Sequence, residues 1–214
     1  MKSITRQKPF EEVKNLLEGL ERVFVVGCGT CTTMTKTGGI DQVAEMKGRL
    51  QGAGKTVTGQ AVIAVACDEM SETFLKENDR AVRSADSILV MACALGAQRI
   101  GSYLKKPVIP GVDTLFIGLE ETPGCFHEVC AQCGQCIIGE TAGVCPITAC
   151  HKSLVNGPCG GTNNGKCEVD REKDCAWTLI YQRLKEQGRL ELMHRYHPPR
   201  NWQASLRPRV MRVS

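Results

Sequence analysis

The sequence predicts an α/β chain in two parts, with the first over residues 1–120 and the second over residues 121–214. In the first part, short β-branched runs alternate with helical patterns, as in a parallel sheet covered by helices on both faces. A polar, proline-containing link follows at residues 120–124. Nine of the thirteen cysteines then fall between Cys125 and Cys175, among Gly- and Asn-rich loops that contain little Val, Ile or Leu. The second part is therefore expected to be small, loop-rich and cysteine-rich.

The expected elements of the first part follow from periodicity. Residues 8–20 place apolar side chains at helical spacing, and residues 22–27 (RVFVVG) form a continuous apolar run that ends in glycine, as a buried parallel strand does. The same two patterns recur along the chain. Further helices are expected at 40–54, 71–85 and 96–103, and further strands at 61–66, 87–92, 108–110 and 115–118. This order predicts a Rossmann-like domain.

Four cysteines stand at or just after the carboxyl ends of the expected strands: Cys28, Cys31, Cys67 and Cys93. In open parallel sheets, ligands bind beyond this edge. The four thiols could therefore hold a metal centre, most simply a four-iron cluster, although isolated buried cysteines are common in ordinary cores. The loop Gly27–Cys31 lacks the G-x-G-x-x-G spacing of a dinucleotide site, and Gly38-Gly39 is expected to form a plain turn rather than a phosphate site.

The second part contains a compact C-x-x-C-x-x-C run, formed by Cys130, Cys133 and Cys136 and followed by Cys145-Pro146. Bacterial ferredoxins use such a run, with the Cys-Pro cysteine serving the other of two clusters. Four cysteines remain downstream: Cys150, Cys159, Cys167 and Cys175. With Cys125 set aside as the non-ligand, eight thiolates are present, which is the number that two four-iron clusters require.

The pairing of these ligands stays open at this stage. Cys130, Cys133 and Cys136 should share one cluster and Cys145 should belong to the other, while the fourth ligand of the first could be Cys150 or Cys175. Four thiolates would also satisfy zinc, but structural zinc sites favour separated C-x-x-C pairs. The four histidines are expected to be surface or packing residues rather than ligands: His127, His151, His194 and His197.

A last helix is expected to begin at Asp170 or Asp174 and to break at Gly188, which would place Cys175 at a helix start, where backbone N–H groups favour a thiolate. The remaining residues are expected to form an extended tail. Its arginines would make either a solvated end or a partner-docking arm: Arg200, Arg207, Arg209 and Arg212.

Composition limits the classes of function. The net charge is only +4 and no aromatic residues interleave with the basic ones, so no nucleic-acid partner is indicated. No run approaches the roughly 20 apolar residues of a membrane helix, and no secretory signal is recognised. A cysteine-rich chain of this kind is expected to be cytoplasmic and to use its thiols for metal or redox work rather than disulfides.

The motifs CAQCGQC, GVCPITACHK, NGPCGG and DCAWTLIYQRLKEQGRL resemble the small iron–sulfur subunit of the two-subunit methylenetetrahydrofolate reductases of acetogenic bacteria, which contains the methylenetetrahydrofolate reductase C-terminal domain. The first part, with GCGTC and TGG, also looks similar. The resemblance implies an electron-transfer subunit of an oxidoreductase complex, with no catalytic residues of its own. It also implies 4Fe-4S clusters, two in the second domain and a third in the first.

The resemblance further implies the partners. A separate large subunit with FMN or FAD would reduce methylenetetrahydrofolate to methyltetrahydrofolate, in the methyl branch of acetogenic one-carbon reduction (the Wood–Ljungdahl pathway). Ferredoxin or another redox subunit would donate the electrons. Two other hypotheses stand beside this one. The chain could be a zinc-stabilised adaptor for a folate or corrinoid enzyme, or an independent enzyme that uses Cys28 and Cys31 for dithiol chemistry.

Overall fold

The computed structural model describes residues 2–205 and 207–212 and divides into two compact units, Met1–His127 and Glu128–Ser214. The predicted α/β class is confirmed by a four-stranded parallel sheet in the first unit. Strand β6 (Val112–Thr122) runs through position 120, so the first unit extends past the boundary expected from the sequence. Among the described residues, no helix has both the length and the apolar character needed to cross a membrane.

The parallel sheet has the strand order β3-β2-β4-β5. Its strands are β2 (Arg22–Cys28), β3 (Thr56–Ile63), β4 (Ser87–Met91) and β5 (Val108–Pro110). The chain passes from β2 to one side of the sheet and then crosses to the other. The carboxyl ends of β2 and β4 therefore flank a topological switch point, the place where such sheets bind ligands.

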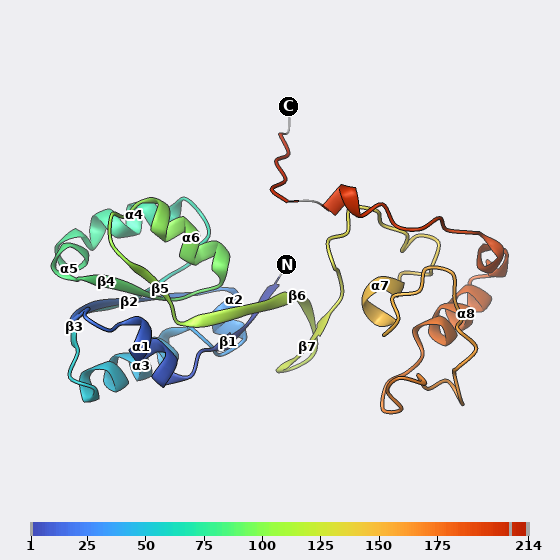
Figure 1. Ribbon diagram of the computed structural model, residues 1–214, viewed down its shortest axis with the longest axis horizontal. Helices are drawn as coiled ribbons and strands as arrows, with labels where there is room; N and C mark the ends of the chain where they lie inside the picture. The colour runs from blue at the N-terminus through green and yellow to red at the C-terminus, as the bar shows by residue number, and fades with distance from the viewer. Residues whose placement is uncertain (1, 206, 213–214) are drawn as a thin grey trace. The chain divides into compact units, whose positions relative to one another are not determined.

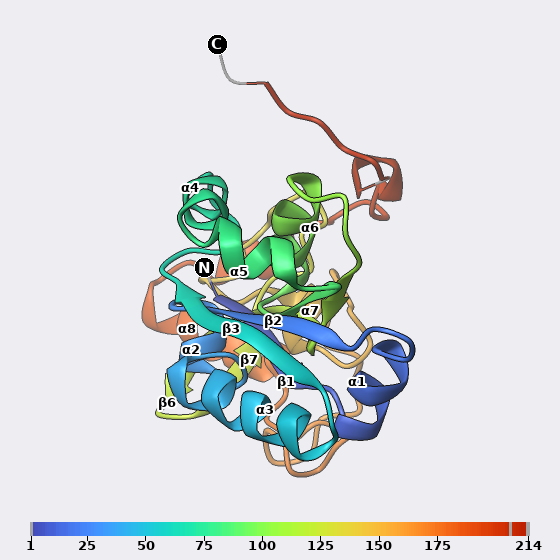
Figure 2. The ribbon, with the colours of Figure 1, turned by 90° about the vertical axis from the view of Figure 1, so that its left-hand side faces the viewer.

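Helices cover both faces of this sheet, with α4, α5 and α6 on one face and α1 and α3 on the other (Figures 1 and 2). Their bounds are α1 (Phe10–Leu16), α3 (Ile40–Gly52), α4 (Met70–Glu77), α5 (Asp79–Ser84) and α6 (Ala94–Ser102), and a short α2 (Cys31–Met34) precedes α3. Alternation along β2 builds the two cores, because Phe24 and Val26 pack toward α4–α6 while Val23 and Val25 pack toward α1 and α3.

Two expectations for this unit are wrong in detail. The strand expected at 61–66 begins earlier, at Thr56, because β3 is an edge strand whose polar first half looks like a loop in the sequence. The helix expected at 71–85 is interrupted at Asn78, whose side-chain Nδ2 donates to the Phe74 carbonyl at 2.9 Å.

A second sheet, in the order β1-β6-β7, was not expected as such. Strand β1 (Lys2–Gln7) pairs antiparallel with β6, with Lys2 opposite Gly118 and a bulge between Ile4 and Thr5. The third strand is β7 (Cys125–Glu128). Strand β1 contains five polar residues among six, so its sequence does not show the apolar run of a buried strand.

The second unit contains little regular structure: α7 (Pro146–Ala149), α8 (Ala176–Glu186), and the 3-10 turns η1 (Leu190–His194) and η2 (Trp202–Ser205). Its core is a small cluster around Trp177, Ile180 and Leu184. The expected helix start at Asp170 or Asp174 is wrong, because both carboxylates are engaged in the preceding turns and α8 begins at Ala176. The expected break at Gly188, which has a φ of +65°, is confirmed.

Candidate metal centres

The first group of thiols lies at the switch point of the parallel sheet. Cys28 is the last residue of β2, Cys31 begins α2, Cys67 follows β3, and Cys93 is the N-cap of α6 after β4. All four line one cavity of about 210 Å³. This is far more space than one water requires, and none of the residues that line the cavity is charged. Sequence reasoning placed these cysteines at one sheet edge, and the structure brings them together there.

Local hydrogen bonds hold the Cys28 loop in place. The Cys28 amide donates to the Gly38 carbonyl at 3.0 Å, and the Cys28 carbonyl accepts from Thr33 Oγ1 at 2.7 Å. The Cys28 sulfur lies 3.1 Å from Thr30 Oγ1 and 3.5 Å from the Ala66 amide nitrogen. The loop after β2 is thus held by the Gly38 carbonyl and the Thr33 hydroxyl, and the Ala66 N–H donates to the sulfur of its first cysteine.

The neighbouring thiols of this group affect the ionisation of Cys67. Burial, followed by the neighbouring Cys93 and Cys28, raises the pKa of the Cys67 thiol above its usual value, and Cys31 adds to the effect. Four thiolates at one site without a basic side chain in the cavity lining repel each other. They can be ionised together only if a cationic group neutralises them, as a metal centre does.

A second group of four cysteines lines a smaller, largely apolar cavity in the second unit: Cys150, Cys159, Cys167 and Cys175. Cys150 follows α7 and Cys175 is the N-cap of α8. The loop between them is pinned by two backbone bonds, from the Cys167 amide to the Lys173 carbonyl (2.9 Å) and from the Cys175 amide to the Gly165 carbonyl (2.7 Å). These bonds explain how cysteines spread over many residues reach one point.

The surroundings of Cys175 favour its thiolate. Burial acts to raise the pKa of the Cys175 thiol, but hydrogen bonds from the Thr178 amide and hydroxyl, from Thr162 and from the Trp177 amide outweigh it, and the net pKa is lowered. Lys152 pairs with Glu168 at the wall of this cavity, and the Cys159 sulfur lies 3.6 Å from the same carboxylate. The placement of Cys175 at a helix start was anticipated; the threonine donors were not.

The C-x-x-C-x-x-C loop forms a third group. Two residues of the loop, Gln132 (φ +55°) and Gly134 (φ +79°), have left-handed backbone conformations that turn the chain sharply. Gln132 donates its amide to the Cys130 sulfur at 3.4 Å. Cys145 is the N-cap of α7 and is not among the residues that line the second cavity, whereas both Cys150 and Cys175 are.

Cys125 and the histidines lie outside these groups of thiols. Cys125 begins β7 in the first unit, with its sulfur 3.3 Å from His127 Nε2. The histidines that were expected to be non-ligands face carboxylates in three cases, with pairs His127–Glu121 (2.8 Å), His151–Asp170 (3.9 Å) and His197–Glu140 (3.5 Å). Among residues 2–205 and 207–212, no three Cys, His, Asp or Glu side chains meet closely enough to hold a single metal ion.

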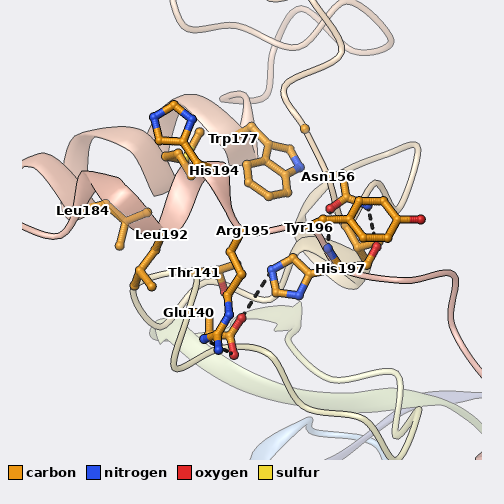
Figure 3. A pocket seen from close by; sticks show the side chains of 13 residues that line it. Glu140, Thr141, Asn156, Trp177, Leu184, Leu192, His194, Arg195, Tyr196 and His197 are labelled. Carbon is orange, nitrogen blue, oxygen red and sulfur yellow. Dashed lines mark hydrogen bonds and ion pairs between the residues drawn. The ribbon is translucent and has the colours of Figure 1, made fainter.

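A further pocket of about 210 Å³ in the second unit is lined by no cysteine (Figure 3). Its polar groups satisfy each other, because Glu140 pairs with Arg195 (3.0 Å) and His197, and Asn156 makes two hydrogen bonds of 2.7 Å to the His197 backbone. These contacts tie the segment after α8 to the loops beneath it. The pocket is therefore assigned a structural role.

The fold and these groups of thiols define a cysteine-rich α/β protein with candidate metal centres in both units. Residues 109–203 match the family model described as methylene-tetrahydrofolate reductase C terminal. The matched stretch is similar to that family and contains nine cysteines, from Cys125 to Cys175; the four cysteines of the first group lie outside it. Comparisons with curated proteins and with solved structures gave no match.

Proposed function

We propose that this chain is the electron-transfer subunit of a methylenetetrahydrofolate reductase complex and carries three 4Fe-4S clusters. The observation that carries the proposal is the sorting of eight cysteines into two cavities of four, together with the match of residues 109–203 to the reductase family. Such clusters, when bound, accept and release single electrons.

We assign the ligands from the cavities that the thiols line. Cys28, Cys31, Cys67 and Cys93 would hold one cluster, and Cys150, Cys159, Cys167 and Cys175 a second. Because the second cavity already has four thiols, neither Cys150 nor Cys175 is available to the C-x-x-C-x-x-C loop. We therefore assign Cys145 to that loop, rather than to the other cluster as the ferredoxin pattern suggests. Cys125 remains the non-ligand.

The donor sets fit a polynuclear cluster better than a zinc ion. A zinc site draws four sulfurs to within about 2.3 Å of one atom, whereas a cluster holds its cysteines farther apart around several metals. The described residues show four thiols around a cavity of about 210 Å³, and no group of ligands is close enough for a single ion. The volume of the first cavity supports an iron–sulfur centre there over a zinc ion.

In the proposed reaction, this chain transfers electrons and makes or breaks no covalent bond of the folate. Reduction of methylenetetrahydrofolate to methyltetrahydrofolate consumes two electrons and two protons. A low-potential one-electron donor such as ferredoxin would supply the electrons to this chain one at a time. The flavin of a partner subunit would collect both and pass them to the folate.

The test mixes the anaerobic, dithionite-reduced chain, freed of excess reductant, with an oxidised flavin-containing reductase subunit in a stopped-flow instrument. The proposal predicts bleaching of the flavin absorbance, with one flavin reduced for every two electrons delivered. A Cys159→Ser variant should deliver fewer electrons, while Cys125→Ser should behave like the unaltered chain. A complex that forms without any flavin bleaching would support the zinc adaptor instead.

A further inference from the structure

In the C-terminal segment, residues 200–205 and 207–209 are folded onto the C-x-x-C-x-x-C loop of the same unit. The Asn201 amide donates to Gln135 Oε1 at 3.1 Å, and Arg209 Nη1 donates to the Gln132 carbonyl at 3.2 Å. A Cβ added to Gly134 would lie 3.2 Å from the Ala204 carbonyl oxygen, so the two segments are in close contact. Figure 1 shows the red C-terminal turn beside the yellow loop. These residues, 200–205 and 207–209, are called the strap below.

Arg200 at the start of the strap is directed at the cysteines. Its Nη2 donates to the Cys133 sulfur at 3.1 Å, although the two residues are 67 positions apart in the sequence. Its Nε is buried and has no hydrogen-bond partner among the described residues. A guanidinium presents its donors in a fixed planar fork, and a buried donor of a charged group without a partner is strongly unfavourable. The orphaned N–H therefore indicates an anionic acceptor beside Cys133.

A four-iron cluster with four thiolates is such an acceptor. Its oxidised form carries a net charge of −2 and its one-electron reduced form carries −3. A cation that donates to a ligand sulfur stabilises the reduced form more than the oxidised one, and hydrogen bonds to sulfur are among the factors that set cluster potentials. Of the three cysteines of the loop, only Cys133, which Arg200 contacts, is partly buried, while Cys130 and Cys136 are exposed.

We propose that Arg200 is a positioning residue that raises the reduction potential of the cluster held by Cys130, Cys133 and Cys136. This inference rests on the proposed function, because it requires a cluster at that loop. It assigns to Arg200 a role other than the solvated end or the partner-docking arm expected from composition alone.

The test is an anaerobic redox titration of the full chain, followed by electron spin resonance and by iron analysis of the same samples. The variant is Arg200→Met, and the control is Arg212→Met, which removes the same charge from an exposed position. Arg200→Met should lower the potential of one centre by about 59 mV or more, a tenfold change in its one-electron equilibrium constant. The other centres and the control should keep their potentials.

Further results of the same titration would support or overturn the inference about Arg200. Arg200→Lys keeps the positive charge but not the planar set of guanidinium donors. The reduction potential of the affected centre in this variant should therefore lie between its values in the original chain and in Arg200→Met. An equal shift in Arg212→Met, or full iron content with no shift in Arg200→Met, would overturn the inference and leave the proposed function standing. Loss of one centre in both Arg200 variants would show a purely structural role and would also overturn it. Absence of iron from the unaltered chain would instead defeat the proposed function itself.

Discussion

Substitution of Gly38 by alanine should damage the first unit and its cysteine site together. Gly38 is buried where the loop after α2 crosses the end of β4. An added Cβ would fall deep inside the van der Waals envelope of the Met91 carbonyl oxygen, 2.7 Å from its carbon and 3.0 Å from the Met91 Cβ. These are mostly backbone atoms of the central sheet, so they cannot move aside cheaply.

The expected magnitude follows from two contributions. Overpacking of a well-filled core costs about 1–3 kcal/mol. Displacement of Gly38 also breaks the 3.0 Å hydrogen bond from the Cys28 amide and leaves a buried donor unpaired, for about 1–3 kcal/mol more. A total of about 2–6 kcal/mol is a large part of the roughly 5–15 kcal/mol that holds a domain folded. Since Cys28 is attached to this loop, the variant should also lose iron from the first group of cysteines.

Gly48→Ala is the matched control. Gly48 lies exposed within α3, and a Cβ there meets nothing within 4 Å. Alanine at such a site should stabilise the helix by about 0.5–1 kcal/mol. The two substitutions are chemically identical and should therefore shift stability in opposite directions.

The assay is urea unfolding of the full chain, followed by far-ultraviolet circular dichroism and tryptophan fluorescence. Both tryptophans, Trp177 and Trp202, belong to the second unit, so fluorescence serves as an internal reference. Gly38→Ala should move the dichroism transition to lower urea and leave the fluorescence transition in place. If Gly38→Ala unfolds at the same urea concentration as the unaltered chain, the close approach of this loop to β4 is wrong.

Three other predictions concern charge, thiol chemistry and metal. A hydrogen-bonded ion pair with Arg22 lowers the pKa of Asp86, so the pair stabilises the fold above the ordinary Asp pKa, and this stabilisation is lost as the pH falls through the lowered value. Asp86→Asn should therefore melt at a lower temperature at pH 7 and lose less stability on acidification. The same dependence of melting temperature on pH in both proteins would contradict this. Thr178→Val removes a hydroxyl that donates to Cys175, so it should raise the pKa of that thiol and lower the potential of one centre in a redox titration; an unchanged potential would count against the second group. Chelation of iron should abolish the tryptophan signal of the folded second unit, whose core is small, but preserve the circular dichroism of the first unit. Loss of both signals together would show that the two units do not differ in their dependence on metal.

The sequence allowed the first cysteine site to be predicted because apolar runs mark where parallel strands end. The runs RVFVVG and SILVMA became β2 and β4, and Cys28 and Cys93 follow at their carboxyl ends. Strand β3 was displaced and β1 was missed, since edge strands carry polar residues and lack a continuous apolar run. The sheet edge itself is determined by the central strands, so these errors did not move the site.

The second unit could be predicted only in part. Cys175 at a helix start was foreseen from a local pattern, but its grouping with Cys150 depends on the path of the intervening loops, which backbone bonds such as that from Cys167 to Lys173 determine. No local pattern encodes such a path. Arg200 could not be linked to Cys133 for the same reason, because their contact is made across the unit rather than along the chain.

The most direct measurement is iron, acid-labile sulfide and zinc content of the full chain purified without oxygen. We expect a brown protein with about twelve irons and as many sulfides, bleached by a strong reductant, and the loss of about four irons in each of Cys93→Ser, Cys133→Ser and Cys159→Ser but not in Cys125→Ser. A colourless protein with stoichiometric zinc, or an iron content that does not respond to these substitutions, would contradict the assignment of the three groups of thiols.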